Sequence, residues 1–168
     1  GLPFVCTNQE YDPSQWEINT RYGGALEAAD DAHLLKLAIK EVASMHGLVA
    51  TFMGRPMEGG TSGYHLHISA WDDAGTNVFE DTDGEYGLSE TARFFIGGVL
   101  EHGRGTTAVM APTINAYKRY QAGSWAPTKM AWANDNRTTG FRVVGSEQSF
   151  RIENRMPGLM QEHVHKGA

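Results

Sequence analysis

The chain has 168 residues, of which 40% are hydrophobic, and a formal charge of −6 with neutral histidines. That length allows one domain with a sizeable core, and the negative charge argues against a nucleic-acid partner. A single cysteine, no apolar run long enough to span a bilayer and no N-terminal signal pattern lead us to expect a cytoplasmic protein without a disulfide framework or a membrane partner.

The first predicted element is a strand at residues 15–18, shortly after Glu10. Gln15 and Glu17 alternate there with two apolar residues, and in a strand this alternation places the two kinds on opposite faces. The polar face of the strand therefore presents a carboxylate.

A helix is predicted over about 30–46 by apolar residues at helical spacing, and Gly47 is the expected terminator. The apolar stripe is expected to be core and consists of Leu34, Leu35, Ala38, Ile39, Val42 and Met45. We expect its histidines, His33 and His46, to be structural.

Residues 64–69 alternate strictly and predict a second strand. Its polar face carries His65, His67 and Ser69, and its other face carries Tyr64 and two aliphatic residues. Alternating histidines are also common on a solvated face, so the pattern by itself leaves a plain surface open.

The stretch 72–87 is rich in Asp, Gly and Thr but lacks the register of a calcium loop, so we expect a solvated loop. A second helix should follow over about 89–102, with a Ser89 cap, a structural His102 and an end before Gly103. Its expected buried residues are Phe95, Ile96, Val99 and Leu100.

The last predicted strand places Arg151, Glu153 and Arg155 on one face and Phe150 and Ile152 on the other. Three strands thus aim Glu, His and Arg at a common place. Carboxylates and imidazole suit a divalent cation, whereas guanidinium groups suit phosphate or carboxylate. Together they indicate a metal-nucleotide site for phosphoryl transfer, although no glycine-rich phosphate loop is present.

A metal hydrolase is the alternative function, and it leaves the arginines unexplained.

Five stretches from residue 10 to residue 157 carry a more specific signal. They are Glu10-Tyr-Asp-Pro-Ser-Gln-Trp-Glu17, Ser62-Gly-Tyr-His-Leu-His-Ile-Ser69, Ala111-Pro-Thr-Ile-Asn-Ala-Tyr-Lys-Arg119, Asn136-Arg137 with Arg142, and Arg151-Ile-Glu-Asn-Arg-Met-Pro157. In this order they resemble the motifs of the glutamine synthetase family. Five ordered matches argue against chance.

The resemblance implies an α+β fold in which a curved, mostly antiparallel sheet lines the active site and helices flank it. Residues 1–168 would be a partial catalytic domain, because the family's smaller N-terminal domain and its Glu-x-Glu strand have no counterpart in this sequence. The resemblance also implies a ring-shaped homo-oligomer, ATP as co-substrate, and Mg²⁺ or Mn²⁺ as cofactor. In that family ATP phosphorylates the side-chain carboxylate of glutamate, and an amine then displaces phosphate to form an amide.

The site residues that the resemblance implies fall into four groups. The metal ligands would be Glu10, Glu17, His65 and Glu153. The ATP-binding residues would be His67, Ser69, Arg142 and Arg151, and the catalytic residues that hold the transferred phosphoryl group would be Arg137 and Arg142. The substrate-binding residues would be Arg119 and Arg155 for glutamate, with Trp125 facing the amine.

Two departures from the family pattern concern the substrates. The active-site flap of the family carries a Glu that helps bind ammonium and accept its proton, and the aligned stretch 122–127 has Trp125 there. Indole cannot act as a base, but it offers an apolar wall and a face that attracts cations, as suits an organic amine or polyamine. The chain therefore resembles the γ-glutamyl-amine and γ-glutamylpolyamine synthetase branch. The second departure is Gly60-Thr61, where the family has Asn-Gly beside the amino-acid substrate.

Three readings of the chain remain open. It could belong to a ligase for organic amines, to an ordinary glutamine synthetase that uses ammonium, or to a remnant that binds nucleotide without catalysis. Several costly convergent charges favour a working enzyme. The tail at 159–168 contains His163 and His165, for which we expect a solvated segment rather than a metal site.

Overall fold

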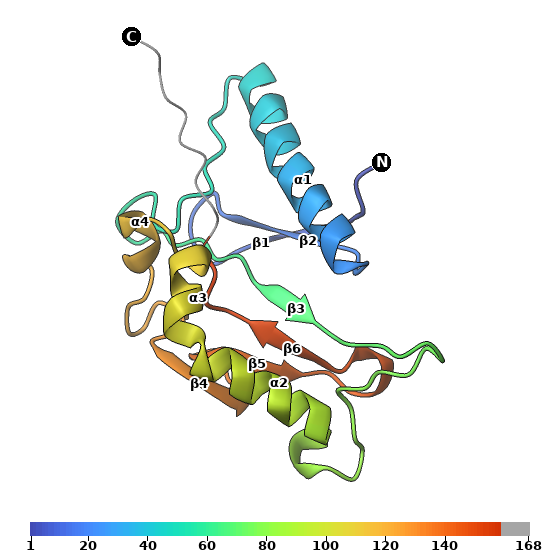
Figure 1. The fold of residues 1–168 in the computed structure, drawn as a ribbon. Coiled ribbons are helices and arrows are strands. Elements are labelled where there is room, and N and C mark those ends of the chain that lie inside the picture. The colour runs from blue at the N-terminus through green and yellow to red at the C-terminus, as the bar shows by residue number, and fades with distance from the viewer. Residues whose placement is uncertain (159–168) are drawn as a thin grey trace. The chain divides into compact units, whose positions relative to one another are not determined.

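The computed structural model describes residues 1–158 and shows two compact units. The first unit comprises Gly1–Phe52 and Pro56–Gly60, and the second comprises Met53–Arg55 and the chain from Thr61 onward. Figure 1 shows the elements of both units along the chain. No helix within these described residues is long and apolar enough to cross a bilayer. The tail with His163 and His165 lies outside the described residues.

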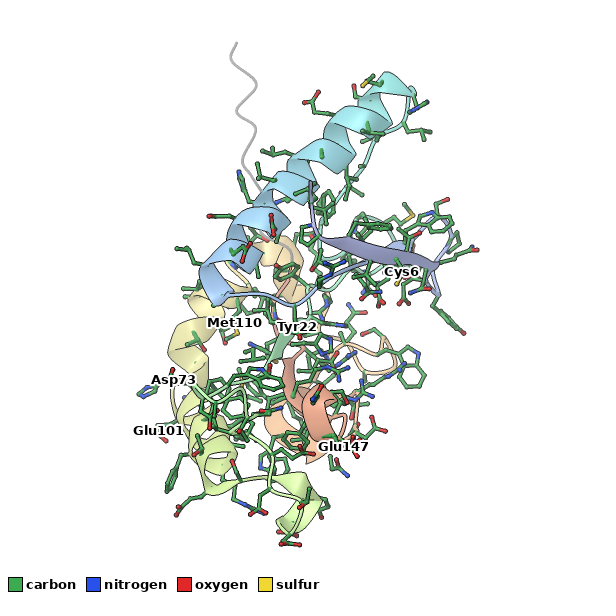
Figure 2. The ribbon with its side chains drawn as sticks, turned by 90° about the vertical axis from the view of Figure 1, so that its right-hand side faces the viewer. Cys6, Tyr22, Asp73, Glu101, Met110 and Glu147 are labelled. Carbon is green, nitrogen blue, oxygen red and sulfur yellow. The ribbon has the colours of Figure 1, made fainter. Side chains whose placement is uncertain are left out.

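The first unit contains an antiparallel hairpin of β1 (Phe4–Gln9) and β2 (Trp16–Thr20), followed by α1 (Ala25–Met45). The predicted strand and helix are both present, although α1 begins at Ala25 rather than near residue 30. Gly47 follows α1 with a φ of +70°, as expected of a terminating glycine. Cys6 on β1 is a free, exposed thiol (Figure 2).

The apolar stripe of α1 corrects one expectation, because no residue of this helix is buried. Val42 and Met45 are 54% and 82% exposed. A single helix and a two-stranded hairpin do not supply a second layer large enough to cover such a stripe. His33 lies in α1 and His46 caps its C-terminus.

The second unit is built on a four-stranded sheet with the order β3-β6-β5-β4. Its strands are β3 (Leu66–Ile68), β4 (Lys129–Asn134), β5 (Thr139–Val144) and β6 (Arg151–Asn154). Strand β6 pairs antiparallel with both β3 and β5, whereas β4 runs parallel to β5. The predicted α+β fold with a mostly antiparallel sheet is therefore confirmed.

Helix α2 (Glu90–Glu101) lies where it was predicted, and the Ser89 hydroxyl accepts a hydrogen bond from the Ala92 amide at 3.1 Å. The expected end before Gly103 is wrong in part, because α3 (Gly103–Met110) begins there at once. Gly103 packs against Met130, which lies 2.9 Å from the place of a Cβ, so its missing side chain serves packing rather than termination. A short helix, α4 (Ile114–Tyr117), follows.

One face of the sheet packs on α2 (Figure 1). The buried core cluster consists of Phe79, Leu88, Ala92, Ile96, Phe141, Val143, Phe150 and Ile152. Phe79 lies in the stretch 72–87, so the expectation of a fully solvated loop is wrong. Asn77 in the same stretch is buried and donates from Nδ2 to the Phe150 carbonyl at 2.7 Å. The short 3-10 helix η1 (Glu85–Gly87) closes this loop.

Candidate active site

The polar face of the sheet carries a row of charged and imidazole side chains. His67 on β3 pairs in register with Glu153 on β6, and Glu153 pairs with Arg142 on β5. Since partners in register lie on the same face, strand alternation brings these three side chains together. The polar faces predicted for the strands at 64–69 and 150–155 are therefore present, and they lie on the same side of the sheet.

Glu153 is the centre of this site. It is 2% exposed, and both of its carboxylate oxygens accept hydrogen bonds. Arg155 donates from Nη1 to Oε1 at 2.6 Å, and Arg142 donates from Nη1 to Oε2 at 3.0 Å. Burial raises the pKa of Glu153, but opposing effects, of which the positive charge of Arg155 is the largest, bring the pKa below its usual value. The carboxylate is thus a permanent anion at neutral pH.

The two histidines beside Glu153 are neutral bases. Burial, followed by the charge of Arg155, lowers the pKa of His65 to about 4, and its Nδ1 lies 3.4 Å from Glu153 Oε1. Burial also lowers the pKa of His67. Arg151 donates from Nε to His67 Nδ1 at 2.9 Å, which leaves the imidazole proton on Nε2, 3.9 Å from Glu153 Oε1.

Two of the four predicted metal ligands, His65 and Glu153, lie side by side in the second unit. A neutral imidazole beside an ionised carboxylate is a donor set that fits a divalent cation. Glu10 and Glu17 belong to the other unit, where each carboxylate accepts a hydrogen bond from a near neighbour in the hairpin. Within residues 1–158, no three His, Cys, Asp or Glu side chains are grouped to hold a metal ion. The four-ligand site stays a prediction.

Asp135, which stands in none of the motifs, forms hydrogen bonds with Arg142. Its Oδ1 accepts hydrogen bonds from Arg142 Nη2 and, at 2.9 Å, from Nε. The hydrogen bond from Arg142 lowers the pKa of Asp135. Its place in the turn between β4 and β5, next to the Asn136-Arg137 motif, was the available signal.

Two further arginines are buried behind the row. Arg119 donates from Nη2 to the Arg155 carbonyl at 2.8 Å and from Nη1 to the Met156 carbonyl at 3.3 Å, and burial lowers its pKa. Gly63 permits this packing, because a Cβ there would lie 2.8 Å from both Arg119 Nη2 and His65 Nε2. The two residues assigned to the acid substrate, Arg119 and Arg155, therefore lie together beside His65.

Trp125 and Ser69, assigned to the amine and to ATP, are each held by a different neighbour. The Trp125 side chain is 63% exposed, and its backbone has a φ of +58°. Its carbonyl accepts a hydrogen bond from Arg155 Nη2 at 3.2 Å, which ties its loop to the site. The Ser69 hydroxyl accepts from Trp71 Nε1 at 2.9 Å, so its contact with ATP stays a prediction.

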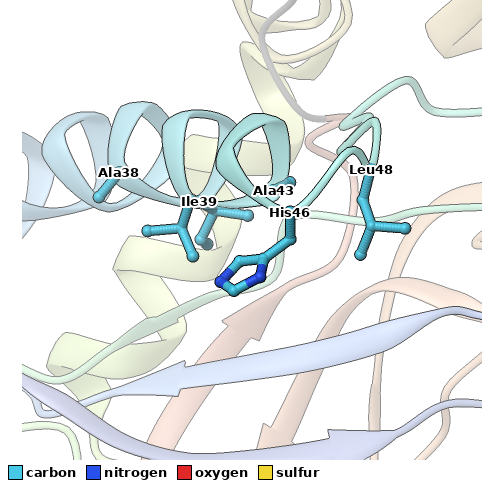
Figure 3. A pocket seen from close by; sticks show the side chains of 6 residues that line it. Ala38, Ile39, Ala43, His46 and Leu48 are labelled. Carbon is cyan, nitrogen blue, oxygen red and sulfur yellow. The ribbon is translucent and has the colours of Figure 1, made fainter.

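A shallow apolar pocket elsewhere contains none of the predicted site residues. It lies at the C-terminal part of α1 and is lined by Ala38, Ile39, Val42, Ala43, His46 and Leu48 (Figure 3). The chemistry-bearing side chains are on the sheet instead. The candidate active site is therefore the polar sheet face around Glu153.

The low pKa of His65 predicts how stability depends on pH. An unfolded histidine titrates near pH 6.5, so between about pH 6.5 and 4 the unfolded chain binds a proton that folded His65 rejects. Stability should therefore fall as pH falls through this window, by roughly 2–3 kcal/mol from this residue. Urea unfolding of metal-free protein at pH 7 and pH 4.5 should show a smaller difference for His65→Asn than for the unchanged protein. If the two proteins lose the same unfolding free energy between pH 7 and pH 4.5, the pKa of His65 is not lowered by folding.

Comparison with known proteins agrees with the geometry. The family described as "Glutamine synthetase, catalytic domain" matches residues 1–160. Among curated relatives, a glutamate–isopropylamine ligase from a Pseudomonas species is 44% identical over 161 residues, which cover 94% of this chain and 35% of that protein. The glutamine synthetase of Halobacterium salinarum is 43% identical over 159 residues, with the same coverage of 94% and 35%.

A third relative is the gamma-glutamylethanolamide synthetase of Streptomyces coelicolor, which is 40% identical over 158 residues, covering 94% of this chain and 34% of that protein. The chain thus spans about a third of the length of these relatives. A match along nearly the whole chain, together with the polar sheet face, identifies the family. The chain belongs to the glutamine synthetase family, whose catalytic domain it matches.

Proposed function

We propose that the protein containing this chain is an ATP-dependent ligase that joins glutamate to an organic amine through a γ-glutamyl phosphate. The observation that carries the choice of acceptor is the exposed indole of Trp125 on a loop tied to the site. We further propose a homo-oligomeric ring and the use of Mg²⁺ or Mn²⁺, as the family resemblance implies.

The phosphoryl half of the reaction needs positive charge held at fixed positions. The row on the sheet supplies such charge, since Arg142 is held between Glu153 and Asp135 and Arg151 is held by His67. We assign ATP contacts to His67, Ser69, Arg142 and Arg151, and stabilisation of the transferred phosphoryl group to Arg137 and Arg142. The guanidinium groups of Arg142 and Arg151 are already oriented by their hydrogen bonds before substrate arrives, so these two groups need little reorganisation in the transition state.

A divalent cation, when bound, would neutralise part of the negative charge of the phosphates. We assign its ligands to Glu10, Glu17, His65 and Glu153. His65 is neutral at physiological pH because burial lowers its pKa to about 4, so it needs to lose no proton to bind a cation. Arg119 and Arg155 are assigned to the carboxylate of glutamate.

The acceptor half depends on Trp125. Indole is neutral and cannot take the proton of ammonium, whereas its face and edge favour contact with carbon atoms and cations. The carbon chain of the amine would rest on the indole, and the amine proton would pass to water or another group. Two relatives bear names that denote amide ligases for isopropylamine and ethanolamine, which supports this proposal.

Ordinary glutamine synthesis is the second candidate. It is supported by relatives named glutamine synthetase at 42–45% identity, as close as the amine ligases. Identity therefore does not choose between the acceptors, and the choice depends on the side chain at position 125.

An amine panel tests the proposal. With the full-length enzyme, we expect phosphate release with isopropylamine, ethanolamine or a polyamine to show a higher kcat/KM than with ammonium, by about 10-fold or more. Trp125→Glu should improve the use of ammonium, because it restores a carboxylate. Trp132→Phe, at a position on β4 packed against the core, is the matched control. Ammonium as the best acceptor, with no gain from Trp125→Glu, would support the glutamine synthetase alternative.

A further inference from the structure

The loop that carries Trp125 is fixed on both sides. Before it, the Ser124 hydroxyl lies 2.6 Å from the Gln121 carbonyl and 3.1 Å from the Arg119 carbonyl. After it, Ala126 and Pro127 are buried. The backbone of the loop is therefore anchored while the indole between the anchors is exposed.

Arg155 provides a third anchor and connects three segments through one rigid group. Its Nη2 donates to the Trp125 carbonyl at 3.2 Å, its Nε donates to the Arg137 carbonyl at 3.0 Å, and its Nη1 donates to Glu153. A guanidinium has five N–H donors in a fixed plane, so these three bonds set the angles between the segments and still leave donors for a substrate carboxylate.

The conformation of Trp125 explains why an anchor is needed. A φ of +58° is disfavoured for a residue with a Cβ, and Trp125 is not a glycine. Such a conformation persists only where surrounding contacts hold it. The bond from Arg155 to the Trp125 carbonyl, in a part of the site where Arg155 is 6% exposed, is such a contact.

We infer that Arg155 is a positioning residue that sets the Trp125 loop relative to Glu153, and so determines how well an amine with a carbon chain is placed. The inference rests on the proposed function, because it assigns Trp125 to the acceptor. It gives Arg155 a role beyond binding glutamate. Because Arg155 is hydrogen-bonded to both the Trp125 carbonyl and the Glu153 carboxylate, a shift of its guanidinium would displace both.

The first test measures the loop in the full-length enzyme without substrates. Arg155→Lys keeps the charge but loses the planar fork, and Arg155→Gln loses the charge and keeps a single NH2 group as donor. Both should speed amide hydrogen exchange in residues 121–126 by about 10-fold, as loss of a charge-assisted hydrogen bond predicts. Arg93→Lys, at a partly exposed arginine on α2 that pairs with Glu85, should leave the loop unchanged. Unchanged exchange in both Arg155 variants would overturn the inference.

The second test separates positioning from general damage. Ser124→Ala weakens another anchor of the loop without altering the guanidinium, and should raise KM for isopropylamine about fivefold while KM for ATP stays constant. Arg155→Lys should do the same to the amine and also raise KM for glutamate. In a Trp125→Ala background, Arg155→Lys should no longer change the ratio of amine to ammonium KM values, because the residue it positions is gone.

The two proposals fail in different ways. If Arg155→Lys changes the ratio of amine to ammonium KM values as much in the Trp125→Ala background as in the unchanged enzyme, Arg155 does not act through Trp125 and the inference is wrong. If ammonium is the best acceptor of the unchanged enzyme, the proposed acceptor is wrong, and faster loop exchange in the Arg155 variants still supports the anchoring role.

Discussion

Glu153→Gln should lower the turnover of the full-length enzyme by about 10²–10³-fold and its free energy of unfolding by about 3 kcal/mol. Both losses have one cause. The carboxylate is buried and is the shared partner of Arg142 and Arg155, and a neutral amide leaves two guanidinium groups without their common anion. Removing one partner of a buried ion pair is costly because the remaining charge stays desolvated.

Steady-state turnover and urea unfolding measure the two effects on one preparation. Glu101→Gln is the control, since Glu101 is an exposed carboxylate at the end of α2. A Glu153→Gln enzyme with the stability of the unchanged protein would show that the arginines do not depend on this carboxylate.

Arg142→Lys should slow formation of the γ-glutamyl phosphate by about 10²-fold or more. Arg142 uses Nη1 on Glu153 and the Nε–Nη2 edge on Asp135, a geometry that a single ammonium group cannot reproduce. We therefore expect kcat to fall while KM for glutamate changes little, the signature of an interaction that matters in the transition state.

Rapid-mixing measurements with ATP and glutamate, before amine is added, isolate this step. Arg104→Lys on the exposed side of α3 is a matched substitution away from the site. If Arg142→Lys raises KM for the amine and leaves the phosphoryl step at its normal rate, Arg142 belongs to the acceptor side instead.

The strand alternation in the sequence predicted much of the site, because period-2 patterns report which side chains share a face. His65 and His67 do lie beside Glu153, and Arg151 reaches His67. Alternation within a strand cannot supply partners that lie outside it, so Asp135 in a turn was missed.

Core membership was less predictable than the strand faces. Phe79 stands in a stretch of Asp, Gly and Thr, and only the tertiary fold of the second unit buries it. The stripe of α1 has helical spacing but no described layer to cover it, since periodicity reports which side is apolar and not what packs there. The placement of Glu10 and Glu17 near His65 stays a prediction for a related reason. No pattern within one segment fixes its distance from another compact unit.

The strand order of the second unit has a consequence for how the site forms during folding. Strands β5 and β6 pair antiparallel and are joined by the short connection 145–150, so this hairpin is a local structure. Strand β3 reaches β6 across a long stretch of chain, and His67 and Arg151 are 84 positions apart. Closing such a loop costs entropy before its contacts reward it, so β3 should dock late. The Glu153 carboxylate and the Arg142 guanidinium would then be paired before the imidazole of His67 docks. A folding intermediate would contain the charged groups of the site before it contains the neutral histidine.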